Sequence, residues 1–358
     1  MDFALSDEQV MLEDAARTAL TRSADMAAVR SALRAGQRLE AAWQALAQGG
    51  LLGILAPEKP GGAGLGWLEA ALLAEAVGHG AVPVPVVDQL VATAILAASG
   101  ASVNALLASA IAGDTSIALA AAEAGGWEPA RFAIDLTDRG LTGTKRQVAF
   151  AAQADYLLVI GQDFAALAER DPRRVTLSPR VGIDGMIPLF TAQFEASPAQ
   201  RLTVDKSSLM AAQSGAMVLI AASALGAASA AIERTIGYTT DRRQFGQPLS
   251  AFQAVRHDLA DQVALLESAR SLLWYAATLL DEADASAARV ARIAKAHITE
   301  AAVTVIRRCV VLHGAIGFSW ECDLQIWLKH AMMCWARYGT PHALRSAVAA
   351  GDIAAQAA

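Results

Sequence analysis

Apolar residues recur at helical spacing toward both ends of the chain, and shorter β-rich runs lie between them. Near the N-terminus, Val10, Leu12 and Leu20 lie close to helical spacing, and Ser6 before two acids is typical of a helix N-cap. Toward the C-terminus, the segment 252–266 places its apolar side chains on one stripe, as a helix of a bundle requires. Both ends are therefore expected to be helical.

The middle of the chain has the pattern of strands and turns. Phe132, Ile134 and Leu136 alternate with small or polar residues, and DYLLVIG, RRVTLSP and QRLTVDK are β-rich runs bounded by Gly, Pro, Asp or Ser. The whole pattern predicts an α+β chain in three parts. These are an N-terminal α-helical domain (1–114), a central β domain that forms a barrel or sandwich (115–206) and a C-terminal four-helix bundle (207–358).

Two long stretches without charge raise the question of a membrane span. Gln89–Gly113 and Ser207–Ile232 are each long enough to cross a bilayer, and the hydrophobic fraction of the chain is 54%. Both stretches consist largely of Ala, Ser, Gly and Gln, whose transfer into a bilayer is weakly favourable at best. Small residues instead let helices approach closely, so we expect buried helices of a large core and no membrane span.

Charge and cysteine content narrow the class of protein. The formal net charge of -6 and the scattered pairs of arginines argue against a nucleic-acid binder. The three cysteines are Cys309, Cys322 and Cys334, and they form no CxxC motif. Together with the lack of a signal-peptide pattern, this favours a cytoplasmic protein in a reducing compartment.

An arginine-rich turn is the first segment with recognisable chemistry. In YTTDRRQFGQPLSAFQ, a helix is expected to run into Arg242 and to end near Phe245. A guanidinium offers a planar fork of donors that suits pyrophosphate, Phe245 could shield that contact from water, and Gln253 could hydrogen-bond a nucleotide edge. The alternative interpretation is a helix C-terminus whose cations complement the helix dipole.

The longer stretch RRQFGQPLSAFQAVRHDLAD resembles the signature of the acyl-CoA dehydrogenases. Four other segments match that family in order: MDFALSDEQVMLEDAAR, GGLLGILAPEKPGGAGLG, LTGTKRQVAF and LHGAIGFSWE. The resemblance covers nearly the whole chain and implies an acyl-CoA dehydrogenase-like fold that binds FAD at a dimer interface. It implies oxidation of an acyl-CoA thioester to the 2,3-enoyl form, in which a carboxylate removes the α proton and flavin N5 takes the β hydride.

By residue match, the resemblance implies a set of cofactor contacts. Arg242, Phe245 and Gln253 would bind the pyrophosphate and adenosine end of an FAD held mainly by the neighbouring subunit. The other implied contacts are Val311, Leu312, His313, Gly314, Ala315 and Thr340. A glycine at Gly314 allows close backbone approach. The family usually has Gln at the position of Val311 and Gly at that of Ala315, so the adenine contact is expected to be weaker here.

No acid stands at either position where the family carries its catalytic base. The common Tyr-Glu-Gly-Thr segment corresponds to Arg337-Tyr338-Gly339-Thr340, and a phenol is a poor base at neutral pH. The other known position corresponds to Ala216, in a stretch (206–232) without any acid. The Trp-Ile-Thr run that covers the flavin ring corresponds to Gln147-Val148-Ala149. We therefore assign no catalytic residue and no metal ligand.

The missing family residues are those that would surround a flavin ring bound by this chain itself. The residues that would contact the nucleotide end of a neighbouring subunit's FAD remain. This pattern is similar to the base-lacking subunit of heteromeric α2β2 acyl-CoA dehydrogenases of bacterial steroid and related side-chain degradation. The implied partners are an acyl-CoA substrate, a second acyl-CoA dehydrogenase subunit and an electron-transfer flavoprotein or equivalent acceptor. Two alternatives stay open: a self-sufficient enzyme whose base has moved to Glu123, Glu233 or Glu321, and a non-catalytic scaffold or acyl-binding protein, free of flavin, on the same fold.

Several single residues have simpler interpretations. The segment CWARYGTPHALR has the composition of an active-site rim, although Cys334 itself is expected to be a small buried side chain. Trp320, Trp327 and Trp335 recur near helical spacing and are expected to anchor the core or an interface. Glu321 is expected to cap a helix.

Overall fold

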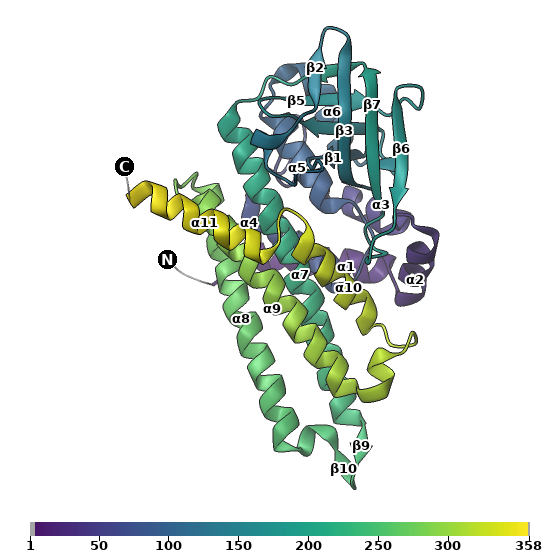
Figure 1. The fold of residues 1–358 in the computed structure, drawn as a ribbon. Helices are drawn as coiled ribbons and strands as arrows, with labels where there is room; N and C mark the ends of the chain where they lie inside the picture. Colours follow the sequence, from purple (N-terminus) through teal and green to yellow (C-terminus); the bar gives the residue numbers. More distant parts are fainter. Residues whose placement is uncertain (1–3, 357–358) are drawn as a thin grey trace.

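The computed structural model describes residues 4–356, which run through helices, then strands, then helices again (Figure 1). The N-terminal helices are α1 (Asp7–Ser23), α2 (Met26–Ala35), α3 (Glu40–Gln48), α4 (Trp67–His79), α5 (Val86–Ala97) and α6 (Asn104–Ile111). The predicted N-cap is confirmed, because Ser6 Oγ accepts a hydrogen bond from the Gln9 amide and the Gln9 side chain accepts one from Ser6.

The middle of the chain folds into two four-stranded sheets. The first contains β1 (Ile117–Ala120), β4 (Tyr156–Ile160), β5 (Ala165–Glu169) and β8 (Ala199–Arg201), in that order of neighbours. The second contains β2 (Asp135–Thr137), β3 (Gly140–Ala149), β7 (Leu189–Ser197) and β6 (Val175–Arg180). Apolar side chains of both sheets share one core. The strand predicted in QRLTVDK is wrong beyond Arg201, because Asp205 there caps the next helix.

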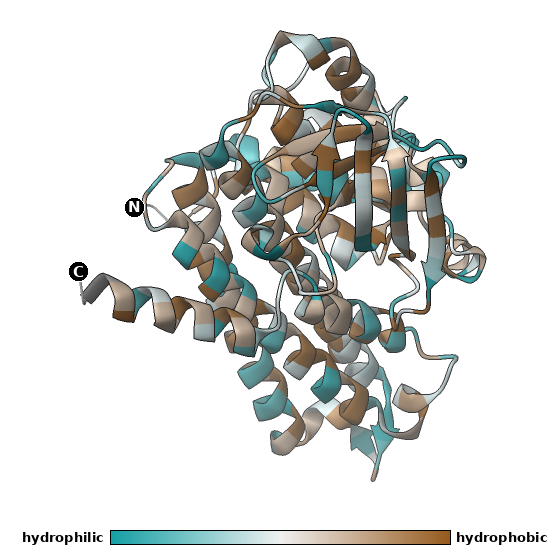
Figure 2. Ribbon diagram, turned by 45° about the horizontal axis from the view of Figure 1, so that its top comes forward, coloured by the Kyte–Doolittle hydropathy of each residue, from teal (hydrophilic) through white to brown (hydrophobic). Residues whose placement is uncertain are grey.

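Long helices form the C-terminal part. They are α7 (Lys206–Asp241), α8 (Gln253–Asp281), α9 (Ala287–His313) and α10 (Leu324–Ala336), followed by α11 (Pro341–Gln356), which projects from the body (Figures 1 and 2). The stripe predicted on α8 is confirmed at Leu259 and Leu266, which are buried, but Val263 is exposed. The predicted fold class is confirmed: an N-terminal helical domain, central β sheets and a C-terminal helical domain.

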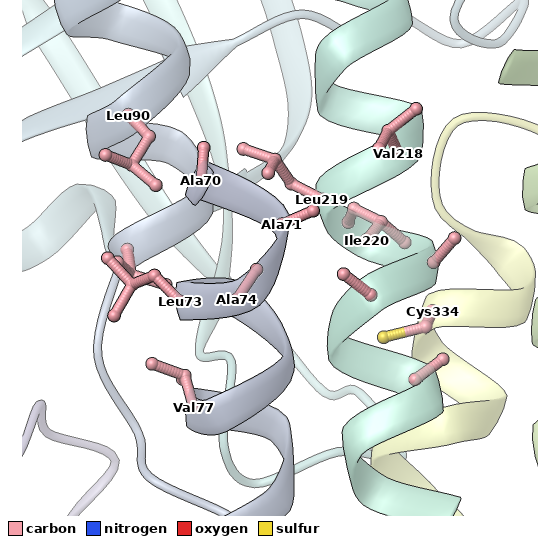
Figure 3. Close-up of a cluster of buried hydrophobic side chains, with 14 of the residues drawn as sticks. Ala70, Ala71, Leu73, Ala74, Val77, Leu90, Val218, Leu219, Ile220 and Cys334 are labelled. Carbon is pink, nitrogen blue, oxygen red and sulfur yellow. The ribbon is translucent and has the colours of Figure 1, made fainter. Parts of the chain in front are cut away.

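Small residues bring α4 and α7 together at the centre of the molecule. A side chain at Gly78 would overlap the backbone of Ser223 on α7, and one at Gly226 would overlap the backbone of Glu75 on α4. Figure 3 shows alanines of α4 facing Leu219 and Ile220 of α7 across this contact. Close approach of this kind requires the small side chains that the sequence supplies.

The apolar stretches pack inside the fold. Three helices, α7, α8 and α9, are long and apolar enough to cross a membrane by length and composition alone, and the apolar window of α7 is 100% buried within the structure. The other charge-free stretch, Gln89–Gly113, is broken by a turn at Gly100 into the helices α5 and α6. Both stretches therefore serve as core helices in this fold.

Candidate cofactor site

A two-residue hairpin forms the tip of the bundle, at the end away from the sheets (Figure 1). Strands β9 (Arg243–Gln244) and β10 (Gln247–Pro248) pair there, with Phe245 and Gly246 between them at φ of 54° and 82°. Positive φ at both central residues is the geometry of a type I′ turn. The Phe245 side chain is 92% exposed, and an exposed aromatic ring at a projecting tip is typical of a contact surface.

Other predicted contacts gather at the same end of the bundle. Tyr238, near the end of α7, stacks on His313 at 4.2 Å between ring centroids and donates a hydrogen bond to its carbonyl. The C-terminus of α7, with Arg242, therefore lies against the turn that begins at Gly314. Gln253 begins α8 in the same region and is exposed. Within residues 4–356, no carboxylate forms an ion pair with the Arg242 guanidinium.

The outer surface of this end is apolar as well as cationic. Val311, Phe318 and Trp320 are all more than half exposed there. Trp320 is therefore not a core anchor, and Trp335 is partly exposed, whereas Trp327 is confirmed as a core residue at 1% exposure. The two exposed tryptophans fit the other half of the prediction, an interface, more closely.

Thr340 does not join the other predicted contacts. It lies at the start of α11, where its Oγ1 accepts a hydrogen bond from the Ala343 amide at 3.3 Å. The preceding carbonyl, that of Gly339, is held by the ammonium of Lys295 on α9. Lys295 lies about five helical turns before His313, roughly 27 Å at 1.5 Å per residue. Thr340 therefore lies away from the predicted contacts at the tip of the bundle.

A small chamber, which Thr340 does not line, lies between the sheets and the bundle. Its walls come from the start of α5, the end of β3, the middle of α7 and the inner face of α10. Ala149 and Arg337 both line it, so it lies where the resemblance puts a flavin ring. Its volume is about 30 Å³. Ligand pockets occupy some 300–1,000 Å³, and about 30 Å³ suits one water, so a flavin ring does not fit.

Tyr338, at the position of the family's base, is a core residue. It is 2% exposed, its ring stacks on Trp127 at 4.3 Å between centroids, and its hydroxyl has no hydrogen-bond partner among the described residues. Burial raises the pKa of the phenol above its ordinary range, so Tyr338 stays protonated and cannot accept a proton. The predicted active-site rim is therefore wrong at Arg337 and Tyr338, which are both buried, whereas Cys334 is confirmed as a small buried side chain.

Asp88 is a chamber residue that the sequence interpretation missed. Its Oδ1 accepts a hydrogen bond from Arg337 Nη2 at 3.1 Å, and both side chains are almost completely buried. Although burial opposes the charge, the carboxylate of Asp88 raises the pKa of Arg337, so the guanidinium stays charged. A lone acid in the apolar run VPVPVVDQL was the available signal, because a buried carboxylate needs a cation nearby.

A second ion pair lies beside the first. On α10, His330 Nδ1 lies 2.8 Å from Asp184 Oδ2 and His330 Nε2 lies 2.7 Å from Ser223 Oγ, both within hydrogen-bond distance. Burial opposes the imidazolium, but Cys334 and Asp184 outweigh burial and raise the pKa of His330 to about 10. The connectivity matches a Ser–His–Asp triad, yet a histidine that is already protonated cannot take the proton of Ser223.

The acids considered as relocated bases lie outside the chamber walls. Glu123 pairs with Lys145 at 2.8 Å and also accepts backbone hydrogen bonds. Glu233 pairs with His79 at 2.8 Å. Glu321 is exposed, and the predicted helix cap is wrong, because α10 has Asp323 at its N-cap.

Comparison with known families and proteins agrees with the resemblance found in the sequence. The profile "Acyl-CoA dehydrogenase, N-terminal domain" matches residues 6–114, and "Acyl-CoA dehydrogenase, C-terminal domain" matches 210–351. Acyl-CoA dehydrogenase IpdE2 of Mycolicibacterium smegmatis is 27% identical over 331 residues, which cover 91% of this chain and 93% of that protein.

Two solved structures superpose over almost the full length. A structure named "Tcur3481-Tcur3483 steroid ACAD G363A variant" has a TM-score of 0.89 at 29% identity, covering 98% of both chains. Butyryl-CoA dehydrogenase of Megasphaera elsdenii has a TM-score of 0.89 at 22% identity, covering 99% of this chain and 100% of that one. At that identity, the second structure shows likeness of fold alone.

Proposed function

Since this chain belongs to the acyl-CoA dehydrogenase family, as matches to both helical domains of the family show, we propose that it is a subunit that completes a partner's FAD site and supplies no catalytic base. The complex would catalyse α,β-desaturation of an acyl-CoA thioester. The observation that carries this proposal is Tyr338: the residue at the position of the base is a buried, protonated phenol stacked on Trp127.

The tip of the bundle fits the nucleotide end of FAD. Arg242 is exposed, and within residues 4–356 no acid competes for its guanidinium, so it could donate charge-assisted hydrogen bonds to a pyrophosphate. Gly314 has φ of 65° and no side chain, which leaves room for a ligand close to the backbone. When bound, FAD supplies the hydride acceptor, and the residues of this chain bind and shield its nucleotide end.

The form of the complex and the class of substrate are also proposals. The similar structure at 29% identity carries a name that joins two proteins and includes the word steroid. We propose an α2β2 complex in which the other subunit holds the flavin ring and the base. The substrate would be the acyl-CoA of a steroid or related side chain, and an electron-transfer flavoprotein or equivalent would accept the electrons.

The test is co-expression of this chain with an acyl-CoA dehydrogenase subunit that retains the base. Flavin content and acyl-CoA oxidation are measured for each chain alone and for the complex. We expect activity from the complex and none from this chain alone. Arg242→Ala should weaken FAD binding by about tenfold to a hundredfold, the range of one charge-assisted contact. The control is Arg139→Ala, an exposed arginine in the turn between β2 and β3.

A second candidate function has one observation in its favour. Asp88 is a carboxylate in the chamber wall with one oxygen, Oδ2, that has no partner among the described residues, so it could serve as a relocated base. That function requires turnover by the isolated chain and its loss in Asp88→Asn. Turnover by carefully isolated wild-type chain would contradict the subunit proposal whatever the variant does.

A further inference from the structure

Helix α10 carries two buried cations that reach different parts of the fold. His330 and Arg337 lie seven positions apart, which puts them on one face of the helix, with Arg337 at its C-cap. His330 binds Asp184 in the segment between β6 and β7, and Arg337 binds Asp88 at the start of α5. One helix is thus tied by charge both to the β sheets and to the N-terminal helices.

We propose that Asp88, Asp184, Ser223, His330 and Arg337 form a clamp, here called the α10 clamp, that closes the chamber against a flavin ring and holds the three parts of the fold together without a cofactor. The inference rests on the proposed function, because a subunit that only completes a partner's site has no use for a ring site of its own. In this proposal, the side chains of the α10 clamp occupy the region in which a flavin ring would otherwise bind.

The pairing within the clamp is nearly complete. Every charged side chain in it has an oppositely charged partner within 3.1 Å, and each is at most 3% exposed. The remaining polar atoms without a partner among the described residues are Asp88 Oδ2 and Arg337 Nε, whose residues both line the cavity of about 30 Å³. A single water fits such a space and could bridge them. Separating either pair would leave an uncompensated buried charge, which is strongly unfavourable, so the two pairs oppose opening of the chamber.

Hydrolysis by the Ser223–His330–Asp184 chain is the competing interpretation. It requires Ser223 to attack a thioester carbonyl while histidine takes the hydroxyl proton. The cavity of about 30 Å³ leaves no room for an acyl group, and the raised pKa of His330 keeps the imidazole protonated beside Asp184. The geometry therefore favours a fixed structural network over a reaction centre.

Thermal unfolding of the isolated full-length chain tests the clamp through ligand-dependent stabilisation. The probes are FMN, which carries the ring without adenosine, ADP, which carries the nucleotide end without the ring, and FAD. We expect no shift in melting temperature with FMN, and no larger shift with FAD than with ADP. A shift with FMN, or an excess shift with FAD accompanied by quenched flavin fluorescence, would overturn the inference.

Variants give a second, independent measurement. Arg337→Met alone should lower the melting temperature, because Asp88 is left buried and unpaired, and the double variant Asp88→Leu with Arg337→Met should recover most of that loss. If the loss of melting temperature in the double variant equals the sum of the losses in the two single variants, the clamp is contradicted. A different measurement would contradict the proposed function: FAD binding by the two-chain complex that is unchanged in the Arg242→Ala variant. Arg242→Ala should leave the melting of the isolated chain unchanged.

Discussion

Tyr338 shows at the scale of one residue why the acid of the family cannot simply be restored. Its backbone has φ of 56°, a conformation that costs a residue other than glycine about 1–2 kcal/mol. Stacking on Trp127 and complete burial hold the side chain in place against that cost. The hydroxyl contributes little, since it has no hydrogen-bond partner among the described residues.

We therefore expect Tyr338→Glu to lower the free energy of unfolding by about 3 kcal/mol or more, because it removes the ring and buries a carboxylate near Asp88. It should not create acyl-CoA oxidation in the isolated chain. Tyr338→Phe is the matched control, and its stability should lie within about 1 kcal/mol of wild type. Urea denaturation measures both. A stable, active Tyr338→Glu chain would contradict the assignment of the chamber as closed.

At the scale of elements, the close contact between helices α4 and α7 depends on glycine. Gly226 on α7 leaves no room for a side chain, whereas Gly237 on the same helix has no atom within 4 Å of an added Cβ. Gly226→Ala should cost about 1–3 kcal/mol or more, because the two helices must separate. Gly237→Ala should stabilise by about 0.5–1 kcal/mol through helix propensity. Equal effects of the two substitutions on chemical denaturation would show that the close approach is unimportant.

Elements of this fold could be predicted because their signals are local. The N-cap at Ser6 and the turn at Phe245 each depend on a few neighbouring residues, whereas the break at Gly100 inside Gln89–Gly113 was not predicted. The tip of the bundle could be assigned for the same reason, although its use as a nucleotide contact stays a prediction. Trp320 is not in the core because it lies in the turn before α10, outside any helix, so helical periodicity does not apply to it.

The contents of the chamber could not be predicted from sequence. Asp88 and Arg337 are 249 residues apart, and Asp184 and His330 are 146 apart. Each looks like an ordinary charged residue until the fold brings its partner close. The lack of an acid at Tyr338 and Ala216 can be read from the sequence alone, whereas the pairing of side chains inside the chamber depends on the tertiary fold.

Two buried cations with opposite pKa shifts contribute to the pH dependence of the stability of the whole molecule. Burial lowers the pKa of Lys295 to about 7, with Cys334 opposing and Arg337 assisting that shift. The pKa of His330, which faces Asp184, Ser223 and Cys334, is instead raised to about 10. The stability contributed by His330 is present below pH 6.5 and is lost as the pH rises toward 10. Lys295 disfavours the folded state below about pH 7, and that penalty disappears as the pH approaches 10.5.

Two variants separate these effects in denaturation measured from pH 6 to pH 10. The stability gap between wild type and His330→Gln should narrow as the pH rises, because the wild type loses the benefit of its imidazolium. Measured against Lys295→Met, the wild type should instead gain relative stability over the same range. A gap that is independent of pH in either comparison would show that the cation concerned is not charged as described.

The exposed aromatic end of the bundle has a consequence for how the chain would be handled in a cell. Phe245, Phe318 and Trp320 stay in solvent until another polypeptide covers them. Chaperones and proteases act on chains that present such surfaces. In the proposed α2β2 complex, copies synthesised in excess of the second subunit would therefore be removed, and the supply of that subunit would limit how much of this chain accumulates.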